Sequence, residues 1–142
     1  MPLLSPADQE KLRASFGEMT SPVRLLFFTQ SLDCDSCLQT RQILDELPPL
    51  SDKITVEEVN FVLEKDKAAQ YGIDRVPAIA LTRADSDSRI RFLGTPSGYE
   101  FISLVQAVLL VGGRGSNLTA ENLARVTAVD RPVTMKVFTT PT

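Results

Sequence analysis

The segment Cys34-Asp35-Ser36-Cys37 holds both cysteines of this 142-residue chain. It directly follows a strongly apolar stretch, Val23 to Gln30, which we predict to be a buried strand. The residues from Ser36 to Leu47 carry apolar side chains at helical spacing, and Pro48-Pro49 ends that helix. A strand therefore runs through a cysteine pair into a helix. This order indicates redox chemistry, because a helix N-terminus favours the thiolate that disulfide exchange requires.

The rest of the chain alternates between predicted helices and strands. We expect helices at residues 5–17, 64–71 and 99–111, and strands at 54–61, 76–81 and 89–93, with a turn at 84–88. From the first strand onward the order is β-α-β-α-β-β-α. A right-handed crossover followed by a β-hairpin gives a central four-stranded mixed sheet with helices on both faces.

Composition limits the classes of binding partner and the cellular compartment that we expect for this chain. The net charge is -3 and the isoelectric point is near 5.0, so we expect neither nucleic acid nor an anionic membrane as a partner. The start of the chain lacks a charged segment followed by an apolar one, and the longest apolar run, Phe101 to Val111, is too short to cross a bilayer. We therefore expect a cytoplasmic protein. In a reducing compartment a close cysteine pair is more often catalytic or metal-binding than structural.

Two blander interpretations of the cysteine pair stay open. A structural zinc site takes about four ligands, and the chain offers two Cys and no His, so zinc would need two chains. The cysteines could also be two inert buried thiols. We favour a redox-active disulfide between Cys34 and Cys37, with no cofactor and no metal.

Three features together resemble the thioredoxin fold: the order of elements, the Cys-x-x-Cys at the start of the first helix after a strand, and Val76-Pro77 at the start of the third strand. The resemblance implies an α/β thioredoxin-like fold with a central four-stranded mixed sheet flanked by helices. An extra N-terminal helix and a C-terminal helix plus strand would be added to it. It also implies that Pro77 is cis and lies against the disulfide, where an ordinary trans Pro is the alternative.

A closer resemblance is to the N-terminal unit of the glutaredoxin-like protein disulfide oxidoreductases. The segments Tyr71 to Pro77 and Phe92 to Phe101 carry it, along with the opening helix and the Phe27-Phe28 strand. Those proteins have two thioredoxin-fold units in tandem, each with its own Cys-x-x-Cys. The Trp-Cys-Gly-Pro-Cys of thioredoxins and the Cys-Pro-Tyr-Cys of glutaredoxins are both absent here. The redox potential and the preferred partner are therefore not implied by the resemblance.

The C-terminal part of the chain contains a weak internal repeat. Val133 to Thr140 repeats the pattern of Val23 to Gln30. We therefore expect residues 1–113 to form one thioredoxin-like domain. Residues 114–142 would be a linker helix, at 118–129, and the first strand, at 133–139, of a second unit truncated after Pro141-Thr142. The edge of such a strand is exposed and offers a surface through which a dimer could form.

The expected function is a protein disulfide oxidoreductase. Cys34 would be the nucleophile, because it lies at the exposed start of the helix, and Cys37, one turn in, would resolve the mixed disulfide. The backbone of Val76 would pair with an extended substrate segment, and Pro77 would shield the disulfide. The partners would be protein dithiols or disulfides and an upstream reductase. A single unit would show only part of the activity of a tandem protein.

Asp33 and Asp35 flank the nucleophile. Each carboxylate at about 4 Å in water disfavours the thiolate by roughly 1 kcal/mol, under one pKa unit, so we expect Cys34 to be less acidic than in strong oxidants. This favours a reductase or isomerase role. The simpler interpretation is two solvated loop acids that help to cap the helix.

Two other functions compete with this one. One is the N-terminal electron-transfer domain of the flavoprotein component of alkyl hydroperoxide reductase, in which the active pair lies in the second of two units. The other is a thioredoxin-like interaction module without catalysis.

Overall fold

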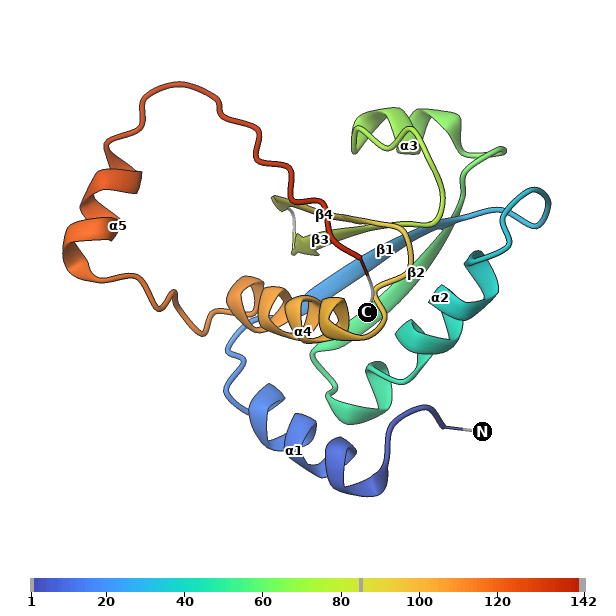
Figure 1. Ribbon diagram of the computed structural model, residues 1–142, viewed down its shortest axis with the longest axis horizontal. Coiled ribbons are helices and arrows are strands. Elements are labelled where there is room, and N and C mark those ends of the chain that lie inside the picture. Colours follow the sequence, from blue (N-terminus) through green and yellow to red (C-terminus); the bar gives the residue numbers. More distant parts are fainter. Residues whose placement is uncertain (1, 85, 141–142) are drawn as a thin grey trace.

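The protein is an α/β molecule, seen in a computed structural model that describes residues 2–84 and 86–140 (Figure 1). Its elements are α1 (Pro6–Phe16), β1 (Val23–Thr29), α2 (Cys37–Asp45), the 3-10 helix η1 (Pro48–Leu50), β2 (Ile54–Asn60), α3 (Lys65–Gln70), β3 (Ala78–Arg83), β4 (Ser86–Leu93), α4 (Tyr99–Val111) and α5 (Ala120–Thr127). Asp85, within the predicted turn, and Pro141-Thr142, at the end of the predicted second unit, lie outside the described residues.

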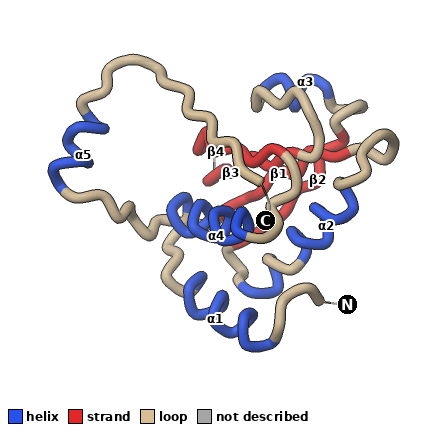
Figure 2. The backbone as a smooth tube through the Cα atoms, in the orientation of Figure 1, coloured by secondary structure: helices blue, strands red, loops and turns tan. Residues whose placement is uncertain are grey.

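The four strands form one mixed sheet in the order β2-β1-β3-β4 (Figure 2). β1 runs parallel to β2 and antiparallel to β3, and β3 and β4 form the predicted hairpin. β1 is therefore a central strand, and six of its seven residues are buried, as its apolar sequence predicts. The predicted thioredoxin-like sheet is confirmed.

Alternate residues of β1 pack on opposite faces of the sheet. Leu25 and Phe27 belong to a core shared with α1, α2 and α4, while Leu26 and Phe28 pack on the α3 side. Figure 1 shows α3 on one side of the sheet and α1, α2 and α4 on the opposite side. Both faces of β1 are thus covered, and this fixes the position at which the strand delivers the chain to Cys34.

The ends of several elements follow the sequence signals. Ser5 caps α1, because its Oγ accepts a hydrogen bond from the Asp8 N–H at 3.1 Å. Gly72, just after α3, has a φ of 68°, the left-handed conformation expected there. Among the residues that the structure describes, no helix is both long and apolar enough to cross a membrane.

The C-terminal segment differs from its prediction. The linker helix is present as α5, capped by the Thr119 hydroxyl, and none of its residues is buried. The predicted strand at 133–139 is not formed, so that part of the prediction is wrong for the chain as described. A strand is held by hydrogen bonds to a neighbouring strand, and the sheet contains only β1 to β4 among the described residues.

Candidate redox site

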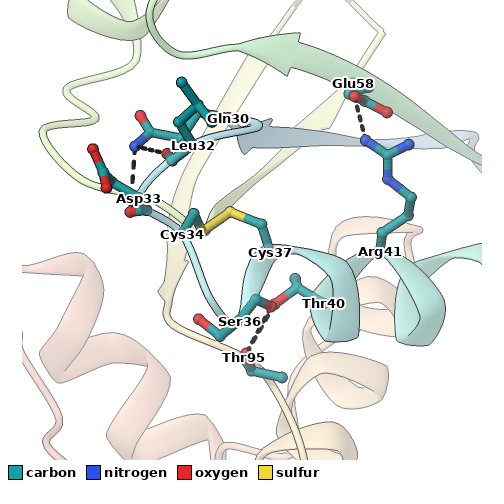
Figure 3. Close-up of a disulfide and its surroundings, with 10 residues drawn as sticks. All are labelled: Gln30, Leu32, Asp33, Cys34, Ser36, Cys37, Thr40, Arg41, Glu58 and Thr95. Carbon is teal, nitrogen blue, oxygen red and sulfur yellow. Dashed lines mark hydrogen bonds and ion pairs between the residues drawn. A yellow bond between two sulfur atoms is a disulfide. The ribbon is translucent and has the colours of Figure 1, made fainter.

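Cys34 and Cys37 form a disulfide in the turn between β1 and α2 (Figure 3). Their Cα atoms are 5.5 Å apart, and the Cys37 N–H donates to the Cys34 carbonyl at 3.4 Å. Cys37 is the first residue of α2 and is 5% exposed, whereas Cys34 lies three residues before the helix and is partly exposed. Cys37 therefore begins the helix instead of lying one turn inside it. The predicted difference in burial between the two cysteines is present.

The loop ahead of Cys34 is held by one side chain. Gln30 Nε2 donates to the Leu32 carbonyl at 2.7 Å and to the Asp33 carbonyl at 3.4 Å (Figure 3). Asp33 has a φ of 53°, a left-handed conformation that Asp tolerates better than most residues. Sequence reasoning did not identify Gln30, because its role depends on how the loop turns back on itself.

Two threonine hydroxyls hold the start of α2 in place through hydrogen bonds. Thr40, fully buried, donates to the Ser36 carbonyl at 2.8 Å, and its Oγ1 lies 2.9 Å from Thr95 Oγ1 in the loop between β4 and α4 (Figure 3). These residues were also missed. The available signal was that Thr40 falls on the same helical face as Cys37 and Leu44, so a polar side chain had to be buried there.

A recess of about 200 Å³ opens beside the disulfide, and both cysteines line it. Its other lining residues are Thr29, Gln30, Ser31, Leu38, Arg41, Glu58 and Asn60. Arg41, one turn along α2 from Cys37, is half-exposed and forms an ion pair with Glu58 of β2. Arg41 and Glu58 therefore carry opposite and compensating charges at the edge of the recess.

Val76 and Pro77 lie on the other side of β1 from this recess. The Val76–Pro77 peptide bond is cis, as the family resemblance implied. Phe28 pairs with Ala78 in the antiparallel ladder, so continuing the register places Pro77 opposite Thr29, near the end of β1. Pro77 is buried, Val76 is partly buried, and the Pro77 carbonyl accepts from the Gly94 N–H at 2.9 Å.

Asp33 and Asp35 are exposed on either side of Cys34. Neither caps α2, whose N-cap residue is Ser36 and which shows no side-chain capping bond. Next to Val76, Asp74 and Arg75 form an ion pair, and the side-chain hydrogen bond from Arg75 lowers the pKa of the Asp74 carboxyl. The net charge around the disulfide is therefore negative.

Residues 2–84 and 86–140 of one chain contain no group of three or more His, Cys, Asp or Glu placed to hold a metal ion, and both sulfurs are engaged in the disulfide. The zinc site considered from the sequence would take its thiolates from two reduced chains.

A Cys-x-x-Cys disulfide after the central strand β1 and a cis-proline directly before β3, in a four-stranded mixed sheet, define a thioredoxin-like disulfide oxidoreductase. No protein-family model matches the chain. A probable thioredoxin of Methanothermobacter thermautotrophicus is 33% identical over 84 residues, which are 58% of this chain and 92% of that protein. The chain therefore belongs to the thioredoxin family.

The chain is also homologous to AhpF, a component of alkyl hydroperoxide reductase. The Escherichia coli (strain K12) protein is 31% identical over 120 residues, 84% of this chain and 21% of that protein. A domain structure of the Enterococcus faecalis protein superposes with a TM-score of 0.81 and 32% identity, covering 90% of this chain and 62% of that one. The chain spans about a fifth of the length of the curated AhpF relatives.

The protein disulfide oxidoreductase of Aeropyrum pernix has the same fold. Its structure matches with a TM-score of 0.75 at 21% identity, over 87% of this chain and 54% of that one. The predicted likeness to that group is thus present, at a lower identity than the likeness to AhpF.

Proposed function

We propose that this chain exchanges protein disulfides, with Cys34 as the attacked and attacking sulfur and Cys37 as the resolving one. The observation that supports this assignment is the unequal exposure of the two cysteines in one disulfide. An incoming thiolate can approach the partly exposed Cys34, while the surrounding protein covers Cys37, which is 5% exposed. The redox group is the disulfide itself.

The reaction is a pair of exchange steps. A substrate thiolate attacks Cys34 Sγ, the Cys34–Cys37 bond breaks, and Cys37 leaves as a thiolate that takes up a proton. The second substrate thiolate then attacks the mixed disulfide, which releases Cys34 as a thiolate and leaves the substrate as a disulfide. The substrate loses two electrons and two protons, and the chain gains both. The reverse sequence reduces a substrate disulfide, and an upstream reductase must then supply the dithiol form.

Val76 and Pro77 are proposed to bind the substrate. The β3 ladder begins at Ala78, so the backbone of Val76 lies beyond it, where an extended substrate segment could add as a short strand. Pro77 would cover the disulfide on this side.

Reduction of insulin disulfides by dithiothreitol tests the proposal. Wild-type protein should accelerate the precipitation of reduced insulin, and Cys34→Ser should fall to the uncatalysed rate. Cys37→Ser is the matched control, because it keeps the attacking thiol and loses only the resolving one. It should accumulate a mixed disulfide with the substrate, visible by mass spectrometry. Equal rates for the wild type and Cys34→Ser would instead support an interaction module without catalysis.

A second candidate is electron transfer within an alkyl hydroperoxide reductase system. The identity of 31% to 34% with AhpF proteins favours it. In this role an AhpF flavoprotein with NADH would reduce the Cys34–Cys37 disulfide. Counting free thiols in the chain after anaerobic incubation with both should give two per molecule, and a count of zero would argue against this role.

Asp33 and Asp35 are proposed to modulate Cys34. Their negative charge favours the protonated thiol and so a reductase or isomerase role. In the reduced protein, replacing both with Asn should raise the rate at which iodoacetamide alkylates Cys34 at neutral pH. An unchanged rate would show that the two acids are only solvated.

The proposed domain organisation keeps residues 1–113 as one thioredoxin-like unit and residues 114–142 as a separate segment that contains the linker helix α5. In this proposal a single unit has part of the activity of a tandem protein. Dimerisation through residues 133–139 would appear as a concentration-dependent mass in analytical ultracentrifugation.

A further inference from the structure

Four apolar side chains lie exposed at the disulfide end of the molecule. They are Leu32, Leu38, Val62 and Leu63, with exposed fractions of 78%, 66%, 53% and 80%. Leu32 belongs to the loop before Cys34, Leu38 follows Cys37, and the other two form the turn between β2 and α3. We call these four residues the apolar rim.

Hydrogen bonds hold the first part of the rim, the turn of Val62 and Leu63, next to the recess beside the disulfide. Asn60 lines the recess beside the disulfide, and its Oδ1 accepts the N–H groups of Val62 and Leu63, each at 3.0 Å. The Phe61 N–H donates to the Thr29 carbonyl at 2.8 Å, which fixes this turn to the end of β1.

The other part of the rim lies around the same recess. Leu38 lines it together with both cysteines, and Gln30, which also lines it, holds the Leu32 carbonyl (Figure 3). The rim therefore lies on the β2 side of the disulfide, across β1 from Pro77.

The charges interspersed with the rim are predominantly negative. Asp33 and Asp35 are exposed and join none of the ion pairs found among the described residues. Arg41 pairs with Glu58 and Arg75 pairs with Asp74, so these four charges compensate one another. Glu64, Lys65 and Asp66, which follow Leu63, are exposed, join none of these ion pairs and add one net negative charge. An approaching protein therefore meets apolar side chains and a net negative charge, with Asp33 and Asp35 next to Cys34.

We propose that the redox partner of this chain is a protein whose reactive cysteine lies beside apolar side chains with Lys or Arg next to them. This inference rests on the proposed function. Exchange requires the partner's sulfur to reach bonding distance of Cys34, so the surface around that sulfur must cover the rim. Apolar partner residues are then buried against Leu38 and Leu63, and basic ones lie close to Asp33 and Asp35.

Single-turnover reduction of three synthetic peptides tests the inference. Each peptide carries the same internal disulfide, flanked by Leu and Lys, by Leu and Glu, or by Ser and Lys. The chain is first reduced with dithiothreitol and then freed of it, so the Cys34–Cys37 dithiol supplies the two electrons and two protons. Reduced peptide is quantified by chromatography over time. Hydroxyethyl disulfide, which is neutral and small, reports the basic exchange reaction.

The wild type should reduce the Leu-Lys peptide about tenfold faster than each of the other two, as expected for a difference of roughly 1.4 kcal/mol in encounter and binding. High salt should reduce the Lys-to-Glu ratio, because charge attraction is screened. Ratios between peptides are compared within each variant, so a changed reactivity of Cys34 cancels.

In the double variant Asp33→Asn, Asp35→Asn, the rate for the Leu-Lys peptide divided by the rate for the Leu-Glu peptide should fall close to one. In the double variant Leu38→Ser, Leu63→Ser, the rate for the Leu-Lys peptide divided by the rate for the Ser-Lys peptide should fall close to one. The matched controls are Asp130→Asn and Leu123→Ser, exposed residues of the C-terminal segment, and both should keep the wild-type ratios.

Two failures can be told apart. Ratios near one in the wild type, with hydroxyethyl disulfide still reduced, would overturn the inference about the partner. Reduction of hydroxyethyl disulfide no faster by the wild type than by Cys34→Ser would overturn the proposed function itself.

Discussion

Thr40 and Thr95 join the start of α2 to the loop before α4 through one contact of 2.9 Å between their hydroxyls. Replacing Thr95 with Val preserves the shape and removes that partner, so the free energy of unfolding should fall by about 1 kcal/mol. Thr40→Val should cost somewhat more, roughly 1–3 kcal/mol, because the residue is fully buried and also bonds the Ser36 carbonyl. Urea unfolding of the oxidised protein measures both.

The double variant separates a shared contact from two independent ones. Because both substitutions remove the same hydroxyl contact, the double variant should lose less stability than the sum of the single losses. Strictly additive losses would mean that the two threonines do not interact in solution.

Residues that carry chemistry could be predicted, while those that position them could not. Cys34, Cys37 and Pro77 stand out by residue type and by place relative to predicted strands. Thr40 and Gln30 act through hydrogen bonds to backbone carbonyls, and those bonds depend on how the loops fold. No pattern in the sequence specifies that geometry.

At the scale of elements, β4 contains a pair whose effect should depend on pH. Arg91 donates to Asp87 at 2.6 Å and to the Tyr71 carbonyl at 3.0 Å, so it ties the hairpin to the loop after α3. The side-chain hydrogen bond from Arg91 holds the pKa of the Asp87 carboxyl below its ordinary value.

A lowered folded-state pKa fixes the sign of the effect. The pair stabilises the folded state above the unfolded-state pKa of about 4, and this contribution is lost as the pH falls through the folded-state pKa. Asp87→Asn should therefore be less stable than wild type by a constant amount above about pH 5, and the gap should close toward pH 2. Urea unfolding across this range measures the gap. A gap that stays constant to pH 2 would contradict the assigned cause.

Two segments with similar sequence patterns show that a local pattern alone does not determine whether a strand forms. Val23–Thr29 and residues 133–139 have similar apolar patterns, yet only the first forms a strand. β1 has β2 on one side and β3 on the other, and their backbone groups complete its hydrogen bonds. The pattern of residues 133–139 predicts a central strand as well, but a central strand forms only where neighbours exist. Tertiary partners, which a local pattern does not encode, decide this case.

At the scale of the whole molecule, the first unit closes at Gly112, whose carbonyl accepts the N–H groups of Thr20 and Ser21 at 2.8 and 3.0 Å. From residue 116 to residue 140 every side chain is exposed. Removing residues 116–142 should therefore change the free energy of unfolding by less than about 1 kcal/mol, because the described part of this segment buries no apolar side chain in the core. Insulin reduction should also keep its dependence on Cys34.

Phe16→Ala is the matched control for this deletion, since Phe16, the last residue of α1, is 1% exposed and belongs to the hydrophobic core. It should cost about 3–5 kcal/mol in the same urea unfolding experiment. If the deletion cost as much as this core substitution, residues 116–142 would have to pack on the first unit in solution, and the proposed boundary near residue 113 would be wrong. A small loss with full insulin reduction would instead place the whole redox site and its supporting core within the first unit, because α1, the sheet, α2 and the loop of Thr95 all precede the boundary.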